Sequence, residues 1–251
     1  MQKFTSRKVY VFFFSVLVFM LHLPVAFSST KPLIFKTSDN PVSSVINNIV
    51  SRTEYFAALY NNMDLSVMGL SEDAFNYAMK GFDNLVNNGK IGNTRIITIV
   101  DFTKPSSKKR MYVIDVLNEK VLFYTYVAHG QKSGKEFANQ FSNIPESYQS
   151  SLGFYETSTT YTGKNGYSMK LKGLENGINN KAEERAVVVH GAPYVSESFI
   201  NTKGYLGRSW GCPALPEKLN KPIIDKIKNG TCLFIYSKND NYLNKSRVLN
   251  S

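Results

Sequence analysis

Apolar residues recur at three- and four-residue spacings in the first third of the chain, a pattern that predicts helices. Residues 42–61 have this spacing. A second helix has recognisable ends, because Ser71 can cap its start and Asn88-Gly89 can terminate it. We expect the apolar and aromatic residues of both helices to pack in a core, and we assign them no chemistry.

From Arg95 onwards the period changes to two, which predicts strands. We expect strands at residues 95–102, 110–117, 120–130, 186–191 and 231–237. The stretch from Gln131 to Glu184 is rich in Gly, Ser, Asn and Tyr and has few periodic segments, although 168–174 could be a strand. We interpret this stretch as long loops that face a substrate. A helix is expected from about Pro216 to Asn229.

These elements predict a mainly β catalytic domain within an α+β chain. Its expected bounds are 93–240, with a helical N-terminal segment at 29–92, one helix late in the domain and a C-terminal tail at 241–251. No internal repeat or linker is visible.

The first 28 residues have the features of a secretory signal peptide. Lys3, Arg7 and Lys8 precede the apolar run Val9–Leu23, and Ala26–Ser28 offers a small-residue cleavage site. We therefore expect export to the periplasm or cell envelope, with no stable membrane span after cleavage. An uncleaved N-terminal anchor is the alternative, which the short apolar run disfavours.

Composition and charge narrow the class of protein further. The chain has 251 residues, 43% of them hydrophobic, which excludes disorder and allows a core without disulfides or metal. Its formal net charge is +11; removing residues 1–28 leaves 27 basic and 19 acidic residues, a net +8. Such a surface attracts anionic polymers, but no nucleic-acid-binding motif is present, so no nucleic-acid partner is expected. Three His and two Cys provide little material for a zinc site.

The two cysteines lie in different settings. Cys232 lies in an apolar strand, where cysteine usually acts as a small buried hydrophobe. Cys212 lies between Gly and Pro at the expected start of a helix, where backbone N–H groups and the helix dipole can lower a thiol pKa. His190, followed by Gly191, is the best candidate for its base. A Cys212–Cys232 disulfide is the alternative that an exported protein permits.

Three segments resemble the murein L,D-transpeptidase catalytic domain family (YkuD-like). HGAPYV at 190–195 is similar to the His-Gly opening of its active-site motif, and GRSWGCPALP at 207–216 is similar to its Ser/Thr-x-Gly-Cys signature. SSLGFYET at 150–157 falls where the family has a segment that leads into the site, which makes Tyr155 a substrate-binding candidate. The resemblance covers roughly residues 95–237 and implies an L,D-transpeptidase-like β-sandwich.

The resemblance also implies roles for individual residues. Cys212 matches the nucleophile and His190 the general base, with the Gly191 carbonyl orienting the imidazole ring. The N–H groups of Gly211 and Cys212 would form the oxyanion hole.

Five further residues are expected to bind substrate. Ser209 and Arg208 match motif positions that line the site, and Arg208 or Arg185 would supply a cation for a substrate carboxylate. Trp210 stands where the family has His; it would wall a groove or simply pack beside the site. His129 is either a binding residue near the substrate entrance or a structural turn residue.

The implied substrate is the peptidoglycan stem peptide. The thiolate would attack the bond between the diamino acid at position three and D-alanine at position four, without a metal or organic cofactor. A second stem amine would complete transpeptidation, and water would give an L,D-carboxypeptidase. A non-catalytic cell-wall-binding protein is the alternative from another class.

Overall fold

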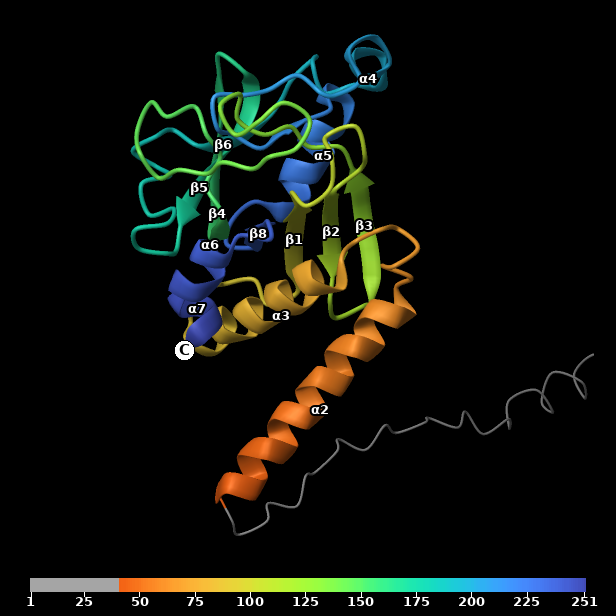
Figure 1. The fold of residues 1–251 in the computed structure, drawn as a ribbon, viewed down its shortest axis with the longest axis vertical. Helices are drawn as coiled ribbons and strands as arrows, with labels where there is room; N and C mark the ends of the chain where they lie inside the picture. The colour runs from red at the N-terminus through yellow and green to blue at the C-terminus, as the bar shows by residue number, and fades with distance from the viewer. Residues whose placement is uncertain (1–40) are drawn as a thin grey trace, which may run out of the picture. The chain divides into compact units, whose positions relative to one another are not determined.

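The structure, a computed structural model, describes residues 41–251, with side chains from residue 51 onwards. The expected signal peptide and the first part of the expected helical segment lie outside these residues. Residues 48–251 form one compact unit, which contains the whole sheet and helices α3 to α7 in Figure 1.

Helices and strands alternate irregularly along the chain. The helices are α2 (Pro41–Asn62), α3 (Glu72–Asn87), α4 (Glu197–Lys203), α5 (Glu217–Ile227), α6 (Asp240–Lys245) and α7 (Arg247–Asn250). The strands are β1 (Ile96–Asp101), β2 (Met111–Asp115), β3 (Lys120–Thr125), β4 (Gly153–Gly163), β5 (Gly166–Gly173), β6 (Val188–Gly191), β7 (Ala214–Leu215) and β8 (Cys232–Tyr236). The predicted helices at 42–61, 72–87 and 216–229 are thus present.

Helix α3 begins and ends as its sequence predicts. The Ser71 hydroxyl accepts a hydrogen bond from the N–H of Ala74 at 3.2 Å, and Asn88 caps the other end. The apolar face of α3 is buried, and a Cβ at Gly81 would run into the ring of Phe154 on β4. Helix α3 therefore packs directly on the sheet, and its side chains belong to the same core as the strands.

The strands form one eight-stranded mixed sheet in the order β3-β2-β1-β8-β4-β5-β6-β7. β1 pairs parallel with β8 and β6 pairs parallel with β7, and the other pairs are antiparallel. All residues of β1, β2 and β8 are buried, which explains why these strands are mostly apolar. The mostly β core in an α+β chain agrees with the expected fold class.

The chain after β3 brings the two ends of this sheet together. Ala128 forms an isolated antiparallel bridge with Ala214 on β7, and Gly130 forms a parallel bridge with Ser209. The sheet therefore nearly closes on itself. This closure places residues 128–131 against the segment that contains Cys212.

Several elements, including the short strand β7, were not expected from the sequence. The interpretation of residues 131–184 as loops was wrong for β4, an eleven-residue strand that pairs with both β5 and β8. The tail expected at 241–251 instead contains α7 and most of α6, and Tyr242 and Leu249 are buried there. Helix α4 was also not predicted.

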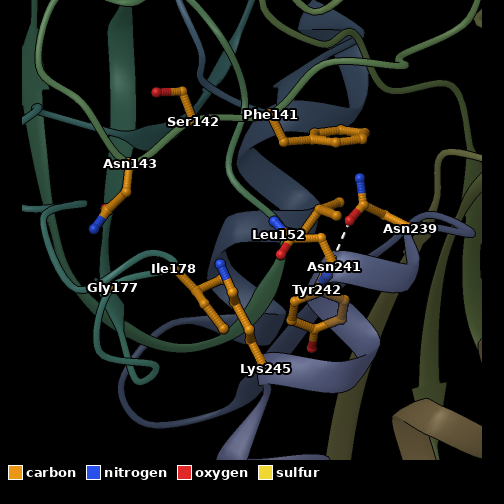
Figure 2. A pocket seen from close by; sticks show the side chains of 10 residues that line it. All are labelled: Phe141, Ser142, Asn143, Leu152, Gly177, Ile178, Asn239, Asn241, Tyr242 and Lys245. Carbon is orange, nitrogen blue, oxygen red and sulfur yellow. Dashed lines mark hydrogen bonds between the residues drawn. The ribbon is translucent and has the colours of Figure 1, made fainter.

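Helix α6 closes one side of a small cavity of about 150 Å³. Figure 2 shows Tyr242 and Lys245 lining it from α6, with Phe141 and Ile178 contributed by the loops around β4 and β5. None of the residues that line it is a predicted site residue. The cavity is thus a feature of how the C-terminal helices pack.

Candidate active site

His190 lies on β6, directly opposite Ala214 of β7 in the parallel pair. Only 5% of the residue is exposed, and its Nδ1 lies 2.9 Å from the carbonyl oxygen of Gly191. Because a carbonyl can only accept, Nδ1 carries the proton and Nε2 keeps a lone pair. A Cβ at Gly191 would approach the Asn220 side chain to 3.1 Å, so the position favours glycine.

Cys212 lies in the turn that precedes β7, two residues before the partner of His190. The expectation of a helix start was wrong, because β7 lies between Cys212 and α5 and no helix dipole acts directly on the sulfur. Burial raises the pKa of the Cys212 thiol, while the N–H of Val188 and the charge of Arg185 act in the opposite direction. The site therefore favours a protonated thiol at rest.

Both cysteines are free thiols. Cys232 is fully buried in β8, opposite Ile97 of β1 and Glu156 of β4. Cys212 is partly exposed. Because both thiols are free, the structure does not contain the alternative disulfide between them.

Ser209 shapes the turn that carries the thiol. Its hydroxyl donates to the Cys212 carbonyl at 2.6 Å and accepts from the Gly211 N–H at 3.1 Å. The Gly211 N–H, expected in an oxyanion hole, is thus already engaged. Gly211 has φ +127°, and a Cβ there would lie 2.8 Å from the Gln149 carbonyl oxygen. Only glycine fits this backbone without strain.

Arg185 lies close to the same turn. Its guanidinium donates to the carbonyl oxygens of Ser142 at 2.7 Å and Gln149 at 2.6 Å, and also to the Ser151 hydroxyl. Burial lowers the pKa of Arg185, and the nearby Tyr155 and Cys212 offset only part of this effect. Arg185 therefore organises the 142–151 loop beside the thiol, and its donors are largely occupied by protein oxygens.

Comparison with known protein families shows to which family the chain belongs. The family described as L,D-transpeptidase catalytic domain matches residues 67–236, which is more than half of the chain and includes His190 and Cys212. The chain belongs to the L,D-transpeptidase catalytic domain family. The match begins well before residue 95, so α3 lies inside the matched region although the sequence resemblance did not extend to it.

Solved structures of L,D-transpeptidases show only a distant likeness. The L,D-transpeptidase from Mycobacterium smegmatis is 12% identical, over 57% of this chain and 59% of that chain, with a TM-score of 0.37. The helical cell shape determining protein Pgp2 from Campylobacter jejuni is 13% identical, over 58% and 49% of the two chains, with a TM-score of 0.38. This chain covers less than two thirds of either protein. No curated protein matches it in sequence.

The other residues expected to bind substrate in this L,D-transpeptidase family member fall into two groups. Arg208 and Trp210 reach the surface near the turn that contains Cys212, residues 209–214, which we call the nucleophile turn. Arg208 donates one hydrogen bond, to the Gly134 carbonyl at 3.3 Å, and Trp210 is 71% exposed and makes a T-shaped contact with the ring of Tyr148. Their roles in substrate binding therefore stay predictions.

His129 and Tyr155 are completely buried. His129 bonds through Nδ1 to Arg110 at 2.7 Å and through Nε2 to the Gly134 carbonyl at 3.2 Å, and Tyr155 donates to the Ser151 carbonyl at 3.0 Å. Side chains enclosed in this way do not face a substrate, which corrects the expectation for Tyr155 and favours the structural alternative for His129. Burial and the Arg110 charge lower the pKa of His129 to about 3.

Two residues of the site were not singled out from the sequence. Tyr194 lines a cavity of about 450 Å³ with Lys203, Tyr205 and Arg208, and burial together with the Cys212 thiol raises its pKa to about 12. Ser150 donates to the Gly211 carbonyl at 3.2 Å. Each belongs to a segment that carries the family resemblance, so the signal was present but pointed to neighbouring residues.

Within the described residues, no group of three or more His, Cys, Asp and Glu is arranged to hold a metal ion. In the same range, no helix combines the length and apolar character needed to cross a bilayer.

Proposed function

We propose that the protein is a cysteine-dependent L,D-transpeptidase that acts on peptidoglycan stem peptides through a thioester on Cys212. One observation carries the proposal. Within the region that matches the family, pairing of β6 with β7 brings His190 beside the turn of Cys212, with the His190 proton held on Nδ1. The remaining ring nitrogen is then in the correct state to accept a thiol proton.

The first half-reaction forms the thioester. His190 Nε2 takes the proton from Cys212 Sγ, and the sulfur attacks the carbonyl carbon of the diamino acid at stem position three. The bond from that carbonyl to the D-alanine nitrogen breaks, and the imidazolium returns its proton to the leaving amine. The Gly191 carbonyl stabilises the transient imidazolium through Nδ1–H.

Charge on the attacked oxygen needs donors from the nucleophile turn. The N–H groups of Cys212 and Gly211 are the proposed donors. Because the Gly211 N–H is bonded to Ser209 Oγ at 3.1 Å, it would exchange this partner for the oxyanion when the tetrahedral intermediate forms. A neutral hydroxyl is a weaker acceptor than an oxyanion, so the exchange favours the intermediate.

The second half-reaction transfers the acyl group. The amine of another stem peptide loses a proton to His190 and attacks the thioester, which releases the Cys212 sulfur and forms the cross-link. Attack by water would instead release a tripeptide.

The cavity beside Arg208 suits the anionic part of a stem peptide. The side chains that line it include two cations, Lys203 and Arg208, and no carboxylate. Neither cation takes part in an ion pair between the described residues. Because the Arg185 donors are occupied, we assign the recognition of a substrate carboxylate to Arg208. Action on this substrate also requires the export that the N-terminal sequence predicts.

The test is incubation of the protein from residue 29 onwards with tetrapeptide muropeptides, followed by mass spectrometry. We expect a thioester adduct on Cys212 and cross-linked products that have lost one D-alanine. Cys212→Ala should form neither, and the matched variant Cys232→Ala should form both. Tripeptide products alone would make the enzyme a carboxypeptidase. Unchanged turnover in Cys212→Ala would overturn the mechanism, and binding of muropeptides without turnover in the unsubstituted protein would leave a wall-binding protein.

A further inference from the structure

Arg110 is a fully buried arginine that forms no ion pair with any described carboxylate. The side chain of Asp101 acts on it only through space. Burial lowers the pKa of Arg110 to about 9, so the group is still charged at neutral pH. A buried charge without a paired carboxylate is costly, and such local costs concentrate where function requires them.

Carbonyl oxygens and a ring nitrogen replace the missing carboxylate. Arg110 Nε and Nη2 donate to the Val127 carbonyl at 3.1 and 2.9 Å, and Nη1 donates to the Lys104 carbonyl at 2.9 Å. Nη2 also meets His129 Nδ1 at 2.7 Å, and the guanidinium lies 4.6 Å from the ring centroid of Phe102. The fork geometry of arginine thus holds the chain just after β3 at two points.

These contacts fix the state of His129. A guanidinium has no acceptor, so His129 Nδ1 must accept, and the ring proton must lie on Nε2. That proton is donated to the Gly134 carbonyl at 3.2 Å, the same oxygen that receives Arg208 Nη1 at 3.3 Å. A protonated imidazole would leave Arg110 facing a donor inside the core.

Residues 128–130, which Arg110 holds through Val127 and His129, are connected to the nucleophile turn by hydrogen bonds at three places. The Ser209 N–H donates to the His129 carbonyl at 2.9 Å, and the Ala128 N–H donates to the Ala214 carbonyl at 2.9 Å. Between them, the Ser150 hydroxyl accepts from the Gly130 N–H at 3.0 Å and donates to the Gly211 carbonyl at 3.2 Å. The bonded turn positions, 209, 211 and 214, bracket Cys212.

We propose that Arg110 is a positioning residue for Cys212: it holds His129 as the neutral Nε2–H tautomer and thereby keeps residues 127–131 in the conformation that clamps the nucleophile turn. Arg110 does not reach the reacting atoms. The role in turnover rests on the proposed function, but the effect on the Cys212 thiol does not.

The test compares Arg110→Met, which removes all five donors, with Arg110→Lys, which keeps the charge but not the fork. Glu175→Gln is the matched control. Glu175 is also a buried ionisable side chain, but its bonds go to Phe154, Tyr242 and Ser246, away from the nucleophile turn. Folding of every variant is checked by circular dichroism and denaturant unfolding.

Two readouts separate positioning from general destabilisation. The protein from residue 29 onwards contains only two histidines, His129 and His190, so nitrogen-15 NMR can follow each tautomer. In Arg110→Met we expect His129 to titrate closer to its ordinary value of 6.5. We also expect the pH midpoint for alkylation of Cys212 by iodoacetamide to fall toward 9.0, as the thiol is released from its buried position. On muropeptides, kcat should fall about tenfold with a smaller change in KM.

Glu175→Gln should lose stability without changing the pH midpoint of His129 titration or of Cys212 alkylation. Both midpoints of Arg110→Lys should lie between those of Glu175→Gln and Arg110→Met. If Arg110→Met does not fold, Arg110→Lys against Glu175→Gln makes the same comparison. An alkylation midpoint equal to that of Glu175→Gln in a folded Arg110 variant would overturn the proposal. A shifted midpoint in a protein that does not process muropeptides would support the positioning of Cys212 and refute only the proposed function.

Discussion

The Sγ atom of Cys212 lies 3.7 Å from the carbonyl oxygen of Ala186, to which the thiol donates. A sulfur held in this way carries its proton, in agreement with the burial that raises its pKa. The pKa of His190 is lowered by burial of its ring. Before the reaction, Cys212 and His190 are therefore both neutral, rather than a preformed thiolate and imidazolium.

This neutral pair predicts the pH dependence of thiol alkylation. The reactive species is the thiolate, whose fraction increases as pH rises through the thiol pKa. Because that pKa lies above its ordinary value of 9.0, the iodoacetamide rate should still be climbing at pH 9. The measurement uses Cys232→Ala, so that one thiol remains, with mass spectrometry of quenched samples. A plateau below about pH 8 would indicate a preformed ion pair.

His190 should set the acid side of the activity profile. Only the neutral ring accepts a proton, and burial places its pKa below 6.5. The value of kcat/KM should therefore hold as pH falls to 6.5 and decline only as pH passes through the lowered pKa. His190→Gln should reduce turnover roughly a hundredfold or more and remove this acid limb. An unchanged acid limb in the variant would assign it to another group.

Local patterns were enough to predict the parts of the fold with strong periodicity. Helix α3 has a cap, an apolar face and a terminator within its own sequence, and β1, β2 and β8 consist mostly of apolar and β-branched residues. β4 has neither signal, because its second half, Ser158–Gly163, is polar and mostly exposed. Its position depends on the hairpin with β5 and on β8, which is distant in sequence. The C-terminal helices likewise depend on a partner, since Glu175 accepts from Tyr242 and Ser246.

The candidate site divides in the same way. Short motifs identified His190, Gly191 and Cys212, and β6–β7 pairing brings these segments together. What the motifs did not contain is burial. The burial of His129 and Tyr155 follows from strands and loops packed around them from elsewhere in the chain. The engagement of the Gly211 N–H by Ser209 is a property of the turn's conformation and not of its residue types.

Replacement of Arg185 and of Arg208 by Met should have different effects on stability and on KM. Arg185→Met removes bonds to the Ser142 and Gln149 carbonyls, so we expect a loss of about 3 kcal/mol in the free energy of unfolding and a slower reaction at Cys212. Arg208→Met removes one long bond, so stability should change by less than about 0.5 kcal/mol. Its KM for muropeptides should rise about tenfold, because a charge-assisted contact to substrate is lost. Urea unfolding and steady-state kinetics measure both, and equal KM changes would contradict the assignment.

Gly211 provides the sharpest test of the turn geometry. Its φ of +127° strains any other residue, and a Cβ would lie 2.8 Å from the Gln149 carbonyl oxygen. We expect Gly211→Ala to cost about 2 kcal/mol or more in the free energy of unfolding and to lower kcat, because the turn must shift away from Gln149 and carry Cys212 with it. Gly166→Ala is the matched control: its φ is +71° and nothing lies within 4 Å of the added Cβ. The control should lose about 1 kcal/mol and keep its kcat. If both variants kept full activity, the tight fit of Gly211 would have no bearing on the nucleophile.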